Sequence, residues 1–381
     1  MSIDINKIIA LRKELHTHPE VSGKEFETAQ RIKAFIEACN PDVILEGLGG
    51  TGIVASWSGK EPGPEILFRA ELDALPIHEI NEFAHKSKNR GVSHKCGHDG
   101  HSAILCGLAQ LLSSRGVPKG KVHLLFQPSE EDGTGAEAML ADKRFDIKPD
   151  FVFALHNIPS YPTNTIIVKE GSFSAAVKSI IIHLKGKTSH AAEPENGINP
   201  AKAMAEILQK SLAEGLNKPE RDDMKIVTPV YVNLGEKAYG TSAGEASIHL
   251  TLRCWTNEYL YSLEKRIEDF SRNIASKEKL QVSFEYTESF MANINDKDCV
   301  DIVRHIARSN KMPLEERRFP FKWGEDFGSL TSRFKGCMFG LGAGTSCPAL
   351  HNPDYDFPDE LVESGIAFFY GIIKKIHNDH V

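Results

Sequence analysis

The segment HKCGHDGH, which runs from His94 to His101, contains three histidines, one cysteine and one aspartate. Cys96 and His98 lie two residues apart just before a predicted helix, so a thiolate and an imidazole can reach one metal ion. Two ligands are weak evidence by themselves, because metal sites in proteins use three or four donors. The segment is therefore either a solvated loop rich in histidine or part of a metal site whose other ligands lie elsewhere.

Further donor residues occur in three later segments. Glu130 and Glu131 directly follow a predicted buried strand, His156 lies at the end of the next strand, and His351 lies in the segment LHNPDYDFPDE. Buried paired acids are costly unless they meet solvent or a cation. Each of these residues can also be an ordinary loop acid or loop histidine. Together, donors from four separate segments favour a single metal site.

The first half of the chain alternates helices and strands. Helices are predicted at 5–15, 26–39 and 99–116, and strands at 52–59, 65–72, 121–128 and 150–159. This alternation indicates an α/β fold with a mostly parallel, mixed sheet. Ligands of such sheets bind beyond the carboxyl ends of the strands. The candidate donors are predicted to lie at those ends.

A second pattern begins near residue 176. Strands and helices in the order strand–helix–strand–strand–helix–strand predict an inserted ferredoxin-like α+β domain. The predicted segments are 177–186, 198–216, 225–234, 245–255, 260–275 and 280–288. The helix and strand alternation returns from about 295. We therefore predict a metal-binding domain from 1–175 and 291–381, with residues 176–290 inserted as a separate domain.

The overall composition excludes several partners. A net charge of −7 over 381 residues offers no basic excess to neutralise phosphates, so neither nucleic acid nor a membrane surface is expected as a partner. No apolar run reaches the roughly 18 residues that a membrane span needs. The N-terminal segment predicts an amphipathic helix and not a signal peptide. Seven cysteines without a disulfide spacing favour reduced thiols, and we expect a cytoplasmic protein.

Eight motifs, taken in order along the chain, carry a resemblance to a known family. They are LRKELHTHPE, FRAELDALP, HKCGHDGH, QPSEEDGTGA, ALHNIP, GKTSHAA, EDFG and HNPDYDFPDE. Together they resemble the M20 metallopeptidase family, in particular its branch of N-acyl-amino-acid, hippurate and indoleacetyl-amino-acid hydrolases. The resemblance implies a zinc-peptidase-like catalytic domain and an inserted domain that serves as a lid and in dimerisation.

The same resemblance implies roles for the donor residues. It implies that one or two divalent metal ions are bound by Cys96, His98, Glu131, His156 and His351. Zn²⁺ or Mn²⁺ is expected, with Co²⁺ or Ni²⁺ as alternatives, because affinity and availability decide between such ions. Glu130 would be the general base, since a carboxylate that is not a ligand must move the proton of the attacking water.

The motif ELDALP departs from the pattern of other branches, which have HxDxVP. Glu71 stands where those branches have a metal-binding histidine, and we do not expect it to bind metal. Asp73 matches the aspartate that supports a ligand by hydrogen bonding. The alternative for Asp73 is a cap of a helix or turn.

Two residues of the inserted domain complete the implied site. His190, in GKTSHAA, matches a histidine that reaches the partner subunit of a homodimer and stabilises the oxyanion of the transition state. Arg253 matches an arginine that binds the carboxylate of the substrate, although a structural salt bridge is the alternative. Relatives often have an asparagine 13 residues before that arginine, where this chain has Gly240.

The sequence thus predicts a metal-dependent amidohydrolase that cleaves a small-molecule N-acyl amino acid or a related compound. A dipeptidase or aminopeptidase of the same family is the first alternative. The second alternative is a non-catalytic, metal-stabilised binding protein. It would be favoured if the base or one of the metal ligands were missing from the sequence, but all of them are present. A structural zinc module fits badly, because its donors form closed Cys and His sets close together in the chain. The motifs do not specify the acyl group or the amino acid.

Overall fold

The computed structural model describes residues 3–379, which form two compact units. The first contains residues 3–173, 293–318 and 325–379, and the second contains residues 174–292 and 319–324. The sequence pattern places 319–324 with the first unit. The segment belongs to the second because the backbone N–H of Ala175 donates hydrogen bonds to the carbonyls of Phe321 and Trp323. The chain therefore enters the second unit twice.

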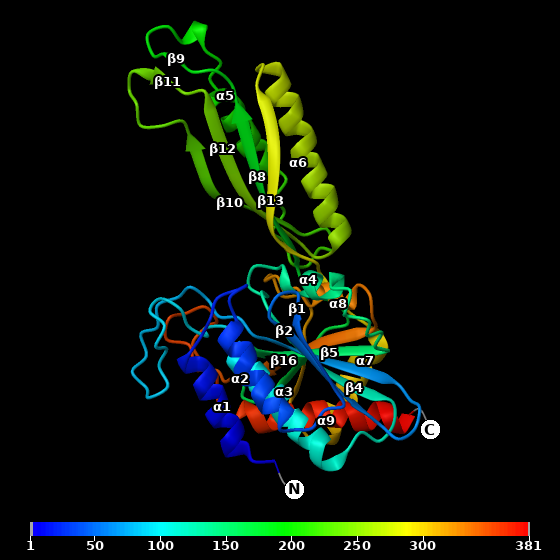
Figure 1. The fold of residues 1–381 in the computed structure, drawn as a ribbon. Helices are drawn as coiled ribbons and strands as arrows, with labels where there is room; N and C mark the ends of the chain where they lie inside the picture. Colours follow the sequence, from blue (N-terminus) through cyan, green and yellow to red (C-terminus); the bar gives the residue numbers. More distant parts are fainter. Residues whose placement is uncertain (1–2, 380–381) are drawn as a thin grey trace. The chain divides into compact units, whose positions relative to one another are not determined.

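An eight-stranded mixed sheet forms the centre of the first unit (Figure 1). In spatial order its strands are β1 (Val43–Leu48), β2 (Gly52–Ser58), β4 (Lys121–Gln127), β3 (Glu65–Glu71), β5 (Phe151–Ile158), β16 (Gly336–Gly342), β6 (Ile166–Val168) and β15 (Leu314–Glu316). The central pairs β4–β3, β3–β5 and β5–β16 run parallel. The pairs β1–β2, β2–β4 and β16–β6 run antiparallel. The carboxyl ends of β3, β4 and β5 therefore lie at one edge of the sheet.

Helices pack with this sheet into one apolar core. The helices that contribute to it are α1 (Ile5–Thr17), α2 (Phe26–Glu37), α3 (His98–Arg115), α7 (Lys297–Ser309) and α9 (Leu361–Asp379). Helix α3 is buried along most of its length, because α1 and α9 pack against it. The first unit also contains α4 (Gly135–Ala141), α8 (Gly328–Thr331) and the strand pair β7 (Gly171–Ser174) and β14 (Asn293–Asn295).

The second unit is a four-stranded antiparallel sheet with two helices (Figure 1). Its main elements are β8 (Ala176–Lys185), α5 (Ala201–Ala213), β10 (Lys225–Leu234), β12 (Glu245–Cys254), α6 (Asn257–Lys277) and β13 (Gln281–Phe290). The strands lie in the order β10-β12-β8-β13, so β10 and β13 are the edges. The two helices pack together on one face, where Ile182, Ile248 and Ile267 are buried. A short pair, β9 (Ser189–His190) and β11 (Thr241–Ser242), and the single turn Pro194–Asn196 complete the unit.

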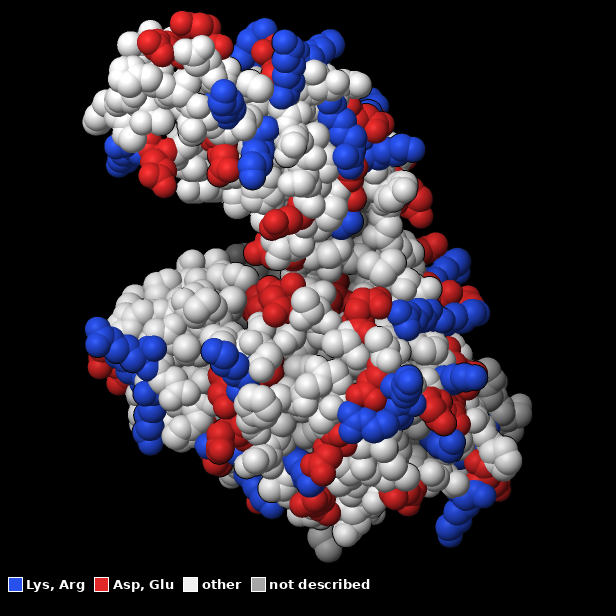
Figure 2. All heavy atoms as spheres, turned by 45° about the horizontal axis from the view of Figure 1, so that its top comes forward, with Lys and Arg blue, Asp and Glu red and all other residues white. Residues whose placement is uncertain are grey.

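The helices and strands predicted from periodicity are all present, with bounds that differ by a few residues. The segment order predicted for the inserted domain is also present. Short strands such as β6 and β15 are not predicted, because three residues are too few to show a period of two. None of the described helices is both long enough and apolar enough to cross a membrane. On the face drawn in Figure 2, Lys and Arg are interspersed with Asp and Glu.

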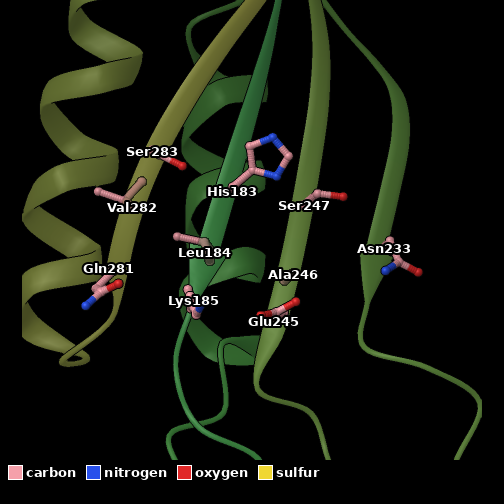
Figure 3. Close-up of a pocket in the computed structure, with 10 residues that line it drawn as sticks. All are labelled: His183, Leu184, Lys185, Asn233, Glu245, Ala246, Ser247, Gln281, Val282 and Ser283. Atoms are coloured by element: carbon pink, nitrogen blue, oxygen red, sulfur yellow. The ribbon is translucent and has the colours of Figure 1, made fainter.

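A polar depression lies on the face of the second sheet that points away from its helices (Figure 3). His183, Ser247 and Ser283 are cross-strand neighbours there, on β8, β12 and β13. None of the residues that the sequence singles out for chemistry lines it.

Gly97 determines how the chain enters α3. It is the N-cap of the helix and has a φ of 97°, which L side chains rarely adopt. A Cβ at this position would lie 2.5 Å from Oδ1 of Asn157 and 2.9 Å from the hydroxyl of Tyr355. Glycine is therefore required here for two reasons, the backbone conformation and the close approach of two side chains.

We predict that Gly97→Ala lowers the free energy of unfolding by about 1–3 kcal/mol more than Gly91→Ala does. Gly91 is a matched control, because its φ is 79° but a Cβ there would meet nothing within 4 Å. Both substitutions carry the backbone cost of a left-handed residue, and only Gly97→Ala adds overpacking. Urea unfolding of the metal-free proteins measures the difference. Equal losses for the two variants would show that the pocket around Gly97 relaxes freely.

Candidate active site

The predicted donors of the first unit meet at the carboxyl ends of three neighbouring strands. Asp73 follows β3, Glu130 and Glu131 follow β4, and His156 lies near the end of β5. The loop that enters α3 supplies Cys96, and the first residue of the helix supplies His98, to the same place. Parallel pairing of β3 with β4 and β5 brings these segments together, although they are distant in sequence.

His98 presents one ring nitrogen to the cluster. Its Nδ1 lies 2.9 Å from the backbone carbonyl of Asp73 and 3.4 Å from the Asp73 carboxylate, so Nδ1 carries the proton and donates. Nε2 is buried and has no hydrogen-bond partner among the described residues. It lies 3.8 Å from Oε2 of Glu130 and 3.9 Å from Oε1 of Glu131. Such a tautomer leaves the Nε2 lone pair available to a metal ion.

The electrostatic environment of His98 favours a positive charge. Burial by itself lowers the pKa of His98, but the carboxylate of Glu71 and the hydrogen bond to Asp73 outweigh burial and raise the pKa to about 10. Without a metal ion this negative potential favours a second proton on the ring, at Nε2. A metal cation, which the same potential favours, would displace that proton and bind the Nε2 lone pair.

Cys96 and His156 form a second part of the cluster. The Sγ atom of Cys96 lies 3.5 Å from Nε2 of His156, and Nδ1 of His156 lies 2.9 Å from the carbonyl of Asn157. Burial lowers the pKa of His156 to about 3, so its imidazole is neutral. Burial and then the carboxylate of Glu131 raise the pKa of the Cys96 thiol well above its usual value. A thiolate is therefore favoured here only when a cation is close.

Glu131 and His351 form the third part. Oε2 of Glu131 lies 3.7 Å from Nε2 of His351, while Oε1 of Glu131 is buried without a hydrogen-bond partner among the described residues. Burial raises the pKa of Glu131 to about 7. The His351 side chain is about half exposed, at 52% of its full area, so this residue lies at the rim of the cluster.

The donor atoms are close enough to share metal ions. Those of Cys96, His98 and His156 lie within 4.8 Å of one another, and so do those of Cys96, Glu131 and His351. Cys96 belongs to both groups and so connects the two sets of donors. The unpartnered atoms, Nε2 of His98 and Oε1 of Glu131, point to the same conclusion, because buried polar atoms normally have partners. The residues present therefore fit a centre of one or two divalent metal ions.

Asp73 and Glu130 adjoin this donor set. A carboxylate oxygen of Glu130 also lies within 4.8 Å of donor atoms of His98 and Glu131. Oδ2 of Asp73 accepts hydrogen bonds from the Ser22 hydroxyl at 2.7 Å and from the Glu131 backbone N–H at 2.9 Å. Asp73 thus contacts both His98 and the turn that carries Glu131. Glu130 is buried, and burial followed by the carboxylate of Glu325 raises its pKa well above the usual value.

A buried network beneath the donor set is not predicted from the sequence. Arg69 donates to Glu71, to Gln127 at 2.9 Å and to Asp326 at 2.7 Å, and it pairs with Glu325 at 2.9 Å. Glu325 and Asp326 belong to the motif EDFG, so this motif binds Arg69. Periodicity cannot find the network, because Arg69 and Asp326 are 257 residues apart.

The remaining residues of HKCGHDGH have different surroundings. Nδ1 of His101 lies 2.7 Å from Oε2 of Glu71, and its Nε2 lies 2.5 Å from Oδ1 of Asn157. Arg69 and His101 thereby engage both oxygens of the Glu71 carboxylate. Asp99 points to His16 and not to a predicted ligand. His94 is buried, and burial lowers its pKa to about 4.

His190 and Arg253 lie in the second unit and are described within it. His190 is exposed on β9, and its Nδ1 accepts a hydrogen bond from the backbone N–H of Ala192 at 3.1 Å. Arg253 lies on β12, where its Nη1 donates to the carbonyl of Lys322 at 2.9 Å. Among the described residues, no carboxylate lies within ion-pair distance of Arg253, so the alternative of a structural salt bridge is not observed. A side chain at Gly240 would meet nothing within 4 Å.

Comparisons with known proteins agree with this geometry. Residues 67–375 match the model of peptidase family M20/M25/M40. The N-acetyl-L-cysteine deacetylase of Bacillus subtilis (strain 168) is 30% identical over 374 residues, which are 97% of this chain and 88% of that protein. An N-acetyldiaminopimelate deacetylase of Enterococcus faecalis is 30% identical over 383 residues, 99% of each chain.

A solved structure is similar over the same length. A dinuclear metal-binding peptidase of the M20 family from Bacillus subtilis superimposes with a TM-score of 0.84 at 27% identity, and the match covers 99% of each chain. The family model covers most of this chain, and the relatives match it from end to end. The chain therefore belongs to peptidase family M20/M25/M40 and is a hydrolase of that family.

Proposed function

We propose that the protein is a metal-dependent amidohydrolase that cleaves the amide bond of N-acyl amino acids. The observation that carries this proposal is the clustering of five donor side chains with two unpartnered buried acceptors beside Glu130, a carboxylate that can serve as a base. The two relatives described above are named deacetylases of N-acetylated amino acids, which supports the same class of substrate.

The donor set is proposed to hold one or two divalent ions. The proposed ligands are Cys96, His98, Glu131, His156 and His351. Zn²⁺ or Mn²⁺ is proposed, with Co²⁺ or Ni²⁺ as alternatives, because thiolate, imidazole and carboxylate ligands suit all four. When bound, such an ion supplies positive charge that lowers the pKa of water and polarises a carbonyl group.

Glu130 is proposed to move the proton. In hydrolysis the oxygen of water joins the carbonyl carbon and the C–N bond breaks. Glu130 takes one proton from the attacking water and delivers it to the departing nitrogen, so the products are an acid and an amine. Its environment supports this role, since burial and the carboxylate of Glu325 raise its affinity for a proton. Asp73 is proposed to orient His98, whose Nδ1 it engages.

The second unit is proposed to join two copies of the chain through β10. Val230, Tyr231 and Val232 of this edge strand are exposed, at 59%, 55% and 38%. The opposite edge, β13, exposes one such side chain, Tyr286 at 41%, between the polar residues Glu285 and Thr287. An apolar edge with unpaired backbone groups favours pairing with another strand, while a charged edge resists it. This contrast supports a second copy of the same chain as the occupant of β10.

His190 and Arg253 are proposed to act on the substrate. Because Nδ1 of His190 accepts a hydrogen bond, a neutral ring carries its proton on Nε2, which can donate to a developing oxyanion in the partner subunit. Arg253 is proposed to bind the carboxylate of the amino acid, which its lack of an ion-pair partner among the described residues supports. Gly240 leaves open space where relatives often have asparagine, so carboxylate recognition would rest more heavily on Arg253.

The cytoplasm is the proposed compartment. All seven cysteines are free thiols, and the six that are buried would not need an oxidising environment to fold.

We predict that Glu130→Gln lowers kcat for deacylation by roughly 10²–10⁴-fold while the protein keeps its metal content, because only the base is removed. The assay uses N-acetyl, N-benzoyl and indoleacetyl amino acids together with dipeptides, and EDTA should abolish turnover. Glu137→Gln is the control, since Glu137 is exposed on α4 and pairs with Arg333. Turnover of dipeptides alone would favour the peptidase alternative, and full activity of Glu130→Gln would exclude Glu130 as the base.

We predict that Tyr231→Glu converts a dimer into a monomer, because the new charge lies on the edge of β10. Thr287→Glu adds the same charge to the opposite edge and should leave the dimer intact. Size-exclusion chromatography with light scattering measures the mass of each variant. A monomeric wild-type protein, or a dimer that only Thr287→Glu disrupts, would contradict the proposed interface.

We predict that a mixture of Glu130→Gln and His190→Ala recovers activity that neither variant has alone. If His190 serves the partner subunit, a mixed dimer holds one complete site. Equal amounts of the two chains, unfolded and refolded together, should give about a quarter of the wild-type rate, since half of the dimers are mixed. If His190 serves its own subunit, no mixed dimer holds a complete site and the mixture stays inactive.

A further inference from the structure

A buried cluster of charged residues lies beside the donor set but contains none of the proposed ligands. It consists of Arg12, His16, Glu79, Lys95, Asp99 and Asp356, and we refer to it as the Arg12 cluster. All but Asp356 are at most 3% exposed. Arg12 and His16 belong to the motif LRKELHTHPE, to which neither the proposed metal site nor the proposed base assigns a role.

Arg12 connects two segments that carry proposed ligands. Its Nη1 donates to Oδ2 of Asp99 at 3.3 Å and to Oδ1 of Asp356 at 2.6 Å. Its Nη2 pairs with Asp359 at 2.9 Å. Asp99 directly follows His98, and Asp356 lies five residues after His351. The planar, forked guanidinium can bind all these carboxylates at once, which an ammonium group cannot do with the same geometry.

His16 and Glu79 fix the other side of Asp99. Nδ1 of His16 lies 2.9 Å from Oδ2 of Asp99, and its Nε2 lies 3.0 Å from Oε1 of Glu79. Burial by itself lowers the pKa of His16, but its hydrogen bonds to Asp99 and Glu79 outweigh burial and raise the pKa to about 9. The ring is therefore charged near neutral pH and donates from both nitrogens.

Lys95 provides a second connection to the segment of His351. Its Nζ donates to Oε1 of Glu79 at 2.5 Å and to the carbonyl of Tyr355 at 2.7 Å. Its own carbonyl accepts a hydrogen bond from the backbone N–H of His351 at 2.8 Å. Lys95 directly precedes the proposed ligand Cys96, and its carbonyl binds the backbone of the proposed ligand His351.

His351 needs such support more than the other proposed ligands do. It has a φ of 66°, a left-handed conformation that is unfavourable for a residue with a side chain. Its side chain is half exposed, whereas Cys96, His98 and His156 are buried. Contacts of its own segment with the rest of the unit must therefore keep it within reach of Glu131.

We propose that Arg12 is a positioning residue of the metal centre, which holds the segment of His351 against the start of α3 by joining Asp99 to Asp356. The proposal rests on the metal site described under the proposed function. A contribution to folding alone explains the cluster poorly, because burying ion pairs often adds little net stability. If the cluster fixes the distance of His351 from Cys96 and His98, its loss should lower the affinity of the site for a metal ion.

The experiment titrates the metal-free protein with Co²⁺ and follows the visible absorption of the bound ion, with a chelator as competitor. His351→Ala identifies the binding step that uses His351. Asp356→Ala should weaken that same step by about 10–100-fold, as loss of a supporting contact to a metal ligand typically does. Any other step should stay unchanged, because His16 still holds Asp99.

Two further variants make the test specific. Asp354→Ala is the matched control, since Asp354 is an exposed aspartate of the same segment, and its side chain makes no hydrogen bond or ion pair with the described residues. It should bind Co²⁺ as the wild type does. Arg12→Lys keeps the charge but removes the fork, and it should weaken the same step as Asp356→Ala. Asp356 is partly exposed, at 27%, so its removal is compatible with folding even if substitution of Arg12 is not.

The outcomes separate this proposal from the hydrolase proposal. Wild-type affinity in Asp356→Ala, or an equal loss in Asp354→Ala, would overturn the role of Arg12. A His351→Ala variant that binds Co²⁺ as the wild type does would overturn it as well. If the wild-type protein binds no metal, both proposals fail. If it binds metal but hydrolyses no N-acyl amino acid, the hydrolase proposal fails while the titration still decides the role of Arg12.

Discussion

One electrostatic constraint dominates the first unit. Several carboxylates, a thiol and two imidazoles are buried together with too few positive charges and hydrogen-bond donors to balance them. Burying charge without a partner costs several kcal/mol. The chain meets this cost in part with Arg69, which lies among Glu71, Glu325 and Asp326. The pKa values of His98 and Glu131 are still raised, which indicates that excess negative charge remains around them. A divalent cation can balance that charge.

The scaffold satisfies this constraint by placing the donors on different elements of one sheet edge. Parallel pairing aligns the ends of β3, β4 and β5, and the buried helix α3 begins at the same edge. His98 and His156 therefore lie in buried elements, and Cys96 is buried two residues before α3, while His351 comes from a surface segment. The charged cluster around Arg12 and the hydrogen bond from His351 to Lys95 compensate for that difference. Support of this kind is expected wherever a ligand is not itself part of a core element.

The second unit has a separate hydrophobic core and an asymmetric sheet. Its helices cover one face, and its two edges differ, because β10 exposes three consecutive large hydrophobic residues while β13 exposes Tyr286 among polar and acidic ones. An edge strand that exposes valine and tyrosine is a liability for a monomer, which is why the asymmetry is informative about assembly. The proposed metal ligands thus belong to the first unit, and the proposed contact between two copies of the chain belongs to the second.

The sequence alone determined the order of the elements and the types of the donor residues, because periodicity and motif spacing are local properties. The helices and strands predicted for both units are present, and so is the inserted order of strands and helices. The tertiary structure decided which atoms meet. Only the folded chain shows that Nε2 of His98 is left without a partner, that Arg69 lies beneath Glu71, and that Arg12 joins Asp99 to Asp356. Arg12 and Asp356 are 344 positions apart, and no local pattern encodes such a contact, because a buried charge finds its partner only once burial has removed water as the alternative.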